Sequence, residues 1–85
     1  MQEFSYVVQC EMGIHARLVA ILANEAKKYK SKMIMIKGSK TAYISNAMEV
    51  LGLHVKCGQM IKVKIIGVDE KNAYQNMKNF LYNNL

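Results

Sequence analysis

Apolar and polar residues alternate along four stretches of the chain, as they do in half-buried β-strands. The stretches are 2–9, 32–37, 40–44 and 60–66. In the first, Phe4, Tyr6 and Val8 share one face, although the spacing alone does not decide which face is the core. Gly38-Ser39 separates the second stretch from the third. This tight-turn pair predicts a β-hairpin.

Two of the intervening segments have helical character instead. The run from Ala16 to about Tyr29 contains no Gly or Pro and many good helix formers. A shorter helix is predicted over 47–51, where Asn46 is a good N-cap and Glu49, three residues later, forms something close to a capping box. Gly52 is expected to stop this second helix.

A third helix is predicted to open at Asp69 and Glu70. Its buried stripe consists of Ala73, Met77, Phe80 and Leu81. The order of elements is therefore β-α-β-β-α-β-α. It predicts an α+β fold, with a four-stranded antiparallel sheet covered by helices on one face and residues 1–85 forming a single domain.

Composition narrows the class of protein. With 52% hydrophobic and 21% charged residues, the 85-residue chain is expected to be a compact globular domain with one core. No apolar stretch approaches about 20 residues, and the first residues alternate, so neither a membrane span nor a signal peptide is indicated. The cytoplasm is the expected compartment. The net charge of +6 favours acidic partners without identifying them.

Two cysteines, Cys10 and Cys57, are separated by many residues and belong to no CxxC pair. We expect two reduced, partly buried thiols and no metal site, because a metal site would need more ligands.

The candidate chemistry lies where the first strand gives way to the first helix, at Gly13-Ile14-His15-Ala16-Arg17-Leu18. A helix starting near Ala16 leaves its first amides without intrahelical partners, and its macrodipole places about half a positive charge at that end. His15 would lie at this positive end. A neutral imidazole there would be a nucleophile, and an anion bonded to it would meet the amides of Ala16, Arg17 and Leu18.

Arg17 adds a fixed charge two residues after His15. A guanidinium can donate to two phosphate oxygens at once, so the pair is suited to forming and holding a phosphohistidine. The alternative is an ordinary surface His–Arg pair with no chemistry, and the spacing alone leaves both open.

The segment Gly13–Arg17 followed by an apolar helix resembles the active-site segment of HPr, the histidine-containing phosphocarrier family of the bacterial phosphoenolpyruvate-dependent sugar phosphotransferase system. The resemblance extends over nearly the whole chain without a gap. Its further matches are Glu25-Ala26-Lys27, Gly38-Ser39-Lys40, Val50-Leu51-Gly52-Leu53, Lys56-Cys57-Gly58 and Asp69-Glu70. It implies the HPr-like open-faced β-sandwich.

The resemblance also implies a function. His15 would take a phosphoryl group from enzyme I and pass it to sugar-specific acceptor domains, while Arg17 steadies the phosphate. The chain would be a phosphotransfer intermediate rather than a stand-alone enzyme, with no cofactor, no metal, no nucleic acid and no membrane insertion. The implied partner-docking residues are Ala20, Ile21, Asn24, Ala47, Met48, Leu51 and Leu53. For Ile21, burial in the core is the alternative.

Three positions depart from the family pattern. Leu18 replaces a proline of the first helical turn, which is expected to cost about 0.4–1 kcal/mol and to restore a backbone donor. Asn46 stands where many members have a regulatory serine. Ser45 is the candidate replacement, although Glu49 would repel a phosphate at this helix start, and its alternative is an ordinary turn serine. His54 replaces a common glycine and is expected to be a surface loop residue.

Two other functions remain open from the sequence. These departures motivate an HPr-like regulatory paralogue that acts by docking to other proteins and does little sugar transport. The element order also occurs in RNA-recognition domains, in which Phe4 and Tyr6 would stack on bases. The third strand, however, lacks the Gly- and aromatic-rich pattern that such domains need.

Overall fold

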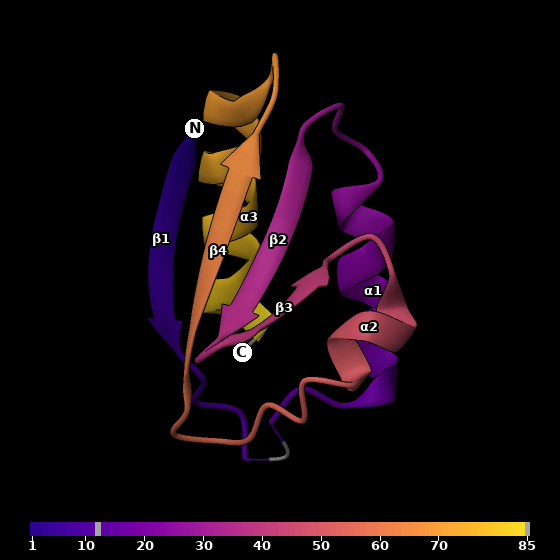
Figure 1. Cartoon of the computed structure of the whole chain (residues 1–85), viewed down its shortest axis with the longest axis vertical. Coiled ribbons are helices and arrows are strands. Elements are labelled where there is room, and N and C mark those ends of the chain that lie inside the picture. Colours follow the sequence, from indigo (N-terminus) through magenta and orange to yellow (C-terminus); the bar gives the residue numbers. More distant parts are fainter. Residues whose placement is uncertain (12, 85) are drawn as a thin grey trace.

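The structure is a computed structural model that describes residues 1–11 and 13–84. Four strands and three helices alternate along the chain in the predicted order (Figure 1). They are β1 (Gln2–Val7), α1 (Ala16–Ala26), β2 (Lys32–Lys37), β3 (Lys40–Tyr43), α2 (Ala47–Leu51), β4 (Met60–Ile66) and α3 (Glu70–Asn84). Among these described residues, no helix is long and apolar enough to span a membrane.

The strands form one antiparallel sheet in the order β1-β4-β2-β3. The last strand in the sequence therefore lies between the first and the second. Phe4 is opposite Val63 in the β1–β4 pair, and Val63 is opposite Met35 in the β4–β2 pair, so three core residues lie side by side. Register is fixed in this way because a slip of one residue would turn every core side chain to the other face. The α+β fold predicted from the sequence is confirmed.

The two faces of the sheet differ sharply in burial. The inward face carries the core residues Phe4, Tyr6, Met33, Met35, Ala42, Ile61, Val63 and Ile65. The alternate positions point away from the helices and include Lys62 and Lys64 on the central strand β4. The alternation along each strand is thus explained by a sheet covered on one face only.

The helices contribute the other half of the core. Leu22 of α1, Val50 of α2 and Met77 of α3 are fully buried. In α3, the predicted stripe of Ala73, Met77 and Leu81 is buried, whereas Phe80 is only partly buried against the core. Two tyrosines of α3 also pack edge-on against β1, Tyr74 on Phe4 with ring centroids 5.6 Å apart and Tyr82 on Tyr6 at 5.0 Å.

Three predicted boundaries were too long. The third strand ends at Tyr43 rather than Ile44, because the Tyr43 carbonyl accepts from the Asn46 amide at 3.0 Å in the turn that follows. The first strand ends at Val7 rather than Gln9, because Val8 pairs with a turn, accepting from the Gly58 amide at 2.7 Å and donating to the Gln59 carbonyl at 3.0 Å. The first helix ends at Ala26 rather than near Tyr29. There the amides of Lys28 and Tyr29 bond to carbonyls three residues back instead of four, which tightens the chain out of the α-helix.

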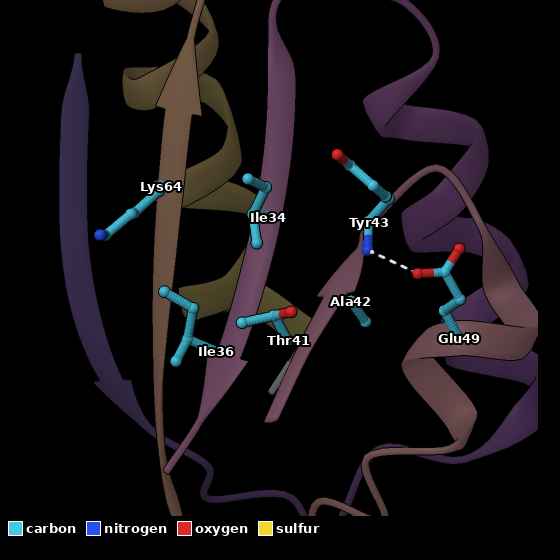
Figure 2. A pocket seen from close by; sticks show the side chains of 7 residues that line it. All are labelled: Ile34, Ile36, Thr41, Ala42, Tyr43, Glu49 and Lys64. Atoms are coloured by element: carbon cyan, nitrogen blue, oxygen red, sulfur yellow. Dashed lines mark hydrogen bonds between the residues drawn. The ribbon is translucent and has the colours of Figure 1, made fainter. Parts of the chain in front are cut away.

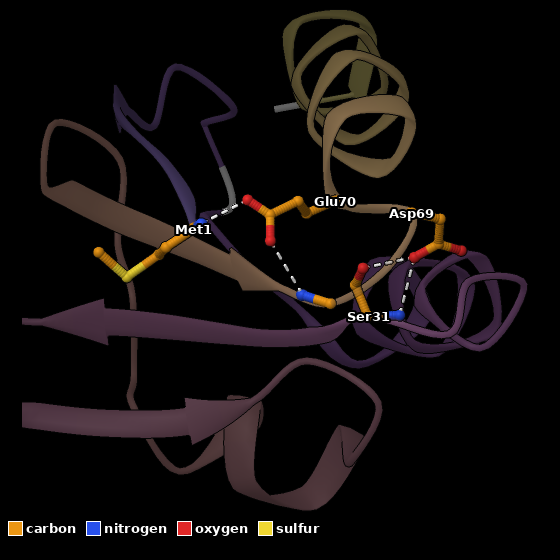
Figure 3. A network of polar contacts seen from close by, with 5 residues as sticks. Met1, Ser31, Asp69 and Glu70 are labelled. Carbon is orange, nitrogen blue, oxygen red and sulfur yellow. Dashed lines mark hydrogen bonds and ion pairs between the residues drawn. The ribbon is translucent and has the colours of Figure 1, made fainter.

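Asp69 joins the start of α3 to the connection between α1 and β2 (Figure 3). Its carboxylate accepts from the Lys30 and Ser31 amides, each at 2.9 Å, and from the Ser31 hydroxyl. The Ser31 hydroxyl, followed by these amides, holds the pKa of Asp69 below its ordinary value. The neighbouring Glu70 carboxylate pairs with the Met1 ammonium, which likewise lowers the pKa of Glu70.

A lowered pKa in the folded state means that the ionised carboxylate stabilises the fold above its unfolded pKa of about 4 and that this stability is lost as the pH falls. We expect Asp69→Asn to lower the free energy of unfolding at pH 7 and to reduce its loss between pH 7 and pH 3. Urea unfolding at both pH values measures this. Ser31→Ala removes the main donor, so the double variant should lose less than the sum of the two single changes. Simple additivity would contradict the shared network.

Candidate functional site

Two loops meet at one end of the sheet and place the segment that leads into α1 (Figure 1). The Ile14 amide donates to the Val55 carbonyl at 3.0 Å, and the Gly13 amide donates to the Cys10 carbonyl at 2.8 Å. Gly13 has a φ of +66°. A Cβ atom on Gly13 would lie 2.5 Å from the Val55 oxygen and 2.9 Å from the Lys56 Cα. Only glycine therefore fits this crossing without displacing one of the loops.

His15 follows as the N-cap residue of α1, in an extended conformation with φ −110° and ψ 169°. Its carbonyl accepts from the Val19 amide at 2.9 Å, which is the first intrahelical bond. The amides of Ala16, Arg17 and Leu18 thus lie in the turn that has no acceptor within the helix. In the described part of the chain, the half-buried imidazole caps no amide of α1.

His15 and Arg17 share a shallow hollow of about 250 Å³ with Leu18, Ile21 and Asn84. Arg17 is exposed, and neither of the two ion pairs found among the described residues involves it. The sequence prediction that these two side chains lie together is consistent with this hollow. Asn84 was missed, because only the packing of α3 beside α1 brings the last turn of α3 to this place. Nothing in its local sequence indicates it.

The arrangement favours an anion bonded to His15. The helix N-terminus supplies amide donors and a partial positive charge, and Arg17 supplies a full one. Within residues 1–11 and 13–84, no group of three or more His, Cys, Asp or Glu side chains is placed to hold a metal ion. A phosphoryl group is one such anion, because it can bond to an imidazole nitrogen while its oxygens accept from amides and a guanidinium.

Beside this hollow, α1 and α2 lie against each other and present the predicted docking residues. Ile21 is 45% exposed and Met48 is 78% exposed, so the alternative of a buried Ile21 is wrong. Ala20 and Asn24 are exposed as well, and Ala47 and Leu51 are partly buried. Leu53 is a correction. It is only 3% exposed and belongs to the core, because the chain turns inward after α2.

Two departures from the family pattern have structural explanations. The Leu18 side chain is buried, and burying a leucine contributes about 1.5–3 kcal/mol, a larger effect than the proline it lacks. His54 is exposed, as predicted, and has a φ of +52°. Glycine adopts this left-handed conformation freely, whereas a histidine is strained there. This requirement explains why a glycine would suit the position.

Ser45 is exposed immediately before the N-cap Asn46. It lines a hollow of about 260 Å³ together with Lys27 and Lys32, so a phosphate on Ser45 would have cations nearby. Its modification stays a prediction.

Both cysteine thiols are free, but Cys57 is exposed rather than partly buried because it lies in a tight turn closed by the Gln59 amide and the Lys56 carbonyl.

A third hollow, of about 250 Å³, lies on the uncovered side of the sheet (Figure 2). Ile34, Ile36, Thr41, Ala42, Tyr43, Glu49 and Lys64 line it, and neither His15 nor Arg17 takes part. The Glu49 carboxylate accepts from the Tyr43 amide at 3.4 Å, so α2 covers the end of the edge strand β3.

Phe4 and Tyr6 face the core and not the uncovered side of the sheet, which removes the basis for the RNA-binding alternative.

Comparison with known proteins agrees with this geometry. Residues 2–83 match the family model described as the phosphotransferase system HPr component phosphorylation site. The phosphocarrier protein HPr of Mycoplasma genitalium is 33% identical over 85 residues, which cover 99% of this chain and 97% of that protein. That of Mycoplasma capricolum is 32% identical over 78 residues, covering 92% and 88%.

The structural comparison gives the same result. A solved mycoplasma histidine-containing phosphocarrier protein superposes with a TM-score of 0.88 at 31% identity, covering 92% of this chain and 89% of that one. An HPr of Thermoanaerobacter tengcongensis gives 0.90 at 26% identity, covering 96% and 92%. The chain belongs to the HPr family of phosphocarriers of the phosphotransferase system.

The crossing at Gly13 generates a prediction. We expect Gly13→Ala to lower the free energy of unfolding by about 2–4 kcal/mol, because it adds left-handed strain to a close contact with the Val55 and Lys56 backbone. Chemical denaturation measures the loss. Gly38→Ala is the matched control, since Gly38 has a φ of +60° but no atom within 4 Å of its Cβ position. Equal losses in the two variants would contradict the close-contact argument.

Proposed function

We propose that this chain carries a phosphoryl group on His15 from enzyme I of the phosphotransferase system to sugar-specific acceptor domains. The observation that supports this most strongly is the position of His15 as the N-cap of α1, in one hollow with Arg17. Family membership supports the phosphocarrier class, and the donor, the acceptors and the direction of transfer belong to the proposal.

The chemistry is an in-line displacement at phosphorus. A lone pair on one His15 ring nitrogen forms a bond to the phosphorus while the bond to the donor's nitrogen breaks and its electron pair stays with the donor. The first amides of α1 and the Arg17 guanidinium then hold the negatively charged oxygens. Transfer to an acceptor repeats the step with His15 as leaving group. Positioning and electrostatic stabilisation account for most of the catalysis in such transfers.

Docking is assigned to the exposed residues of α1 and α2. This surface combines the apolar side chains of Ile21 and Met48 with the nearby charge of Arg17. An apolar patch bordered by a basic residue suits an acidic partner with an apolar centre. The net charge of +6 supports electrostatic steering of such partners. No feature of the described residues favours the regulatory alternative over this relay.

The first prediction concerns the phosphoryl group itself. After mixing with enzyme I, phosphoenolpyruvate and magnesium, the parent chain should gain one acid-labile phosphate by intact mass, and His15→Ala should gain none. Arg17→Gln should transfer about ten- to a hundredfold more slowly without a change in unfolding, because one phosphate clamp is lost. Arg17→Lys keeps the charge but not the bidentate geometry, so its transfer rate should lie between those of the parent chain and Arg17→Gln. Phosphate on His15→Ala, or none on the parent, would contradict the proposal.

The second prediction concerns docking. Ile21→Glu should raise the KM of enzyme I for this chain about tenfold and leave kcat nearly unchanged, because it places a charge in the apolar centre of the docking surface. The matched control is Val68→Glu, at a residue 89% exposed in the connection between β4 and α3. Val68→Glu changes the net charge by the same amount as Ile21→Glu. If both variants raise KM to the same extent, the effect is one of net charge and the assigned surface is wrong.

A further inference from the structure

Lys37, at the end of β2, makes two hydrogen bonds to a distant loop. Its ammonium group donates to the Leu53 and the His54 carbonyl oxygens, each at 2.9 Å. These bonds join residues 16 and 17 positions apart in the sequence. They tie the end of the β2–β3 hairpin to the segment that follows α2.

The segment that Lys37 holds contains a strained residue, His54, and leads into Val55, which bonds to the segment before His15. His54 has the unfavourable φ of +52°, a conformation that persists only where surrounding contacts hold it; its amide donates to the Leu51 carbonyl at 3.1 Å, and Lys37 holds its carbonyl. The next residue is Val55, whose carbonyl accepts from the Ile14 amide at 3.0 Å. Leu53, just before, is buried and anchors the segment to the core.

We propose that Lys37 is a positioning residue for His15. It fixes the Leu53 and His54 carbonyls, these fix the Val55 carbonyl one residue later, and that carbonyl fixes the Ile14 amide next to His15. The importance of His15 rests on the proposed phosphocarrier function, whereas the positional coupling can be measured without it.

The inference has a physical consequence for phosphoryl transfer. Gly13 leaves no space between the two loops, so a shift of the Val55 carbonyl must move the Gly13–Ile14 backbone with it. The His15 ring would then leave the axis on which phosphorus is displaced. In-line displacement is sensitive to such misplacement, because its rate depends on the alignment of the reacting atoms.

The test compares three variants. Lys37→Met keeps the long apolar stem and removes the donors, whereas Lys37→Arg keeps donors and charge. Lys40→Met is the matched control, since Lys40 lies opposite Lys37 in the hairpin, is exposed, and its ammonium group makes no hydrogen bond or ion pair among the described residues. It removes the same charge from the same end of the sheet.

Two readouts are needed. The first is amide hydrogen exchange of Ile14, which reports the bond to Val55 and requires no partner protein. The second is single-turnover phosphorylation at saturating phosphorylated enzyme I, which separates the transfer rate from docking.

Lys37→Met is expected to speed Ile14 exchange about tenfold without speeding exchange in the sheet, and to slow single-turnover transfer at saturating phosphorylated enzyme I about three- to tenfold. Lys37→Arg should restore most of the Ile14 protection and most of the transfer rate. Lys40→Met should alter neither the Ile14 exchange nor the transfer rate. Unchanged Ile14 exchange in Lys37→Met, or equal effects of Lys37→Met and Lys40→Met, overturns the proposal. If the parent chain takes no phosphate, the phosphocarrier function fails, and the exchange experiment still decides the coupling.

Discussion

The backbone hydrogen bond from the Ile14 amide to the Val55 carbonyl joins the loop before α1 to the loop after α2, beside the bonds that Val8 makes with Gly58 and Gln59. The site depends on it, because it sets the direction in which the chain enters α1 and therefore the place of His15. Gly13 allows the close approach that the bond requires, and Leu53 holds the partner loop to the core. In a small domain with one core, a side chain on a loop is held in place by contacts between that loop and the neighbouring elements.

Periodicity was sufficient for the elements because each strand and helix has one covered face. Phe4 and Tyr6 of β1 and Val8 just after it share one face, and the structure shows that this face is the buried one, which their spacing had left open. The three boundaries that were too long, at the ends of β1, α1 and β3, lie where hydrogen bonds to a turn, or to a carbonyl three residues back, replace the regular pattern. Such a change depends on distant partners or on the geometry of the last turn, and the spacing of side chains does not encode it.

The residues of the candidate site could be named from the sequence, whereas the residues that hold them in place could not. His15, Arg17 and the first amides of α1 follow each other in the sequence, so one local segment indicated them. Leu53 was assigned wrongly to the surface, since a residue in a short irregular loop has no period that reveals its side. Lys37 and Asn84 reach the site or its loops only through the tertiary fold, and both resemble ordinary surface residues in the sequence.

Asn84 lines the same hollow as His15 and Arg17, and its side chain donates to the Phe80 carbonyl at 2.8 Å, within the last turn of α3. A segment attached close to Asn84 would therefore start beside the hollow that His15 and Arg17 line. A purification tag or a fused domain at that end would act as a tethered competitor for the space that a partner protein needs, with an effective concentration set by the linker. Fusion partners for this molecule are better attached before Met1, because the N-terminus lies at the opposite end of the sheet (Figure 1).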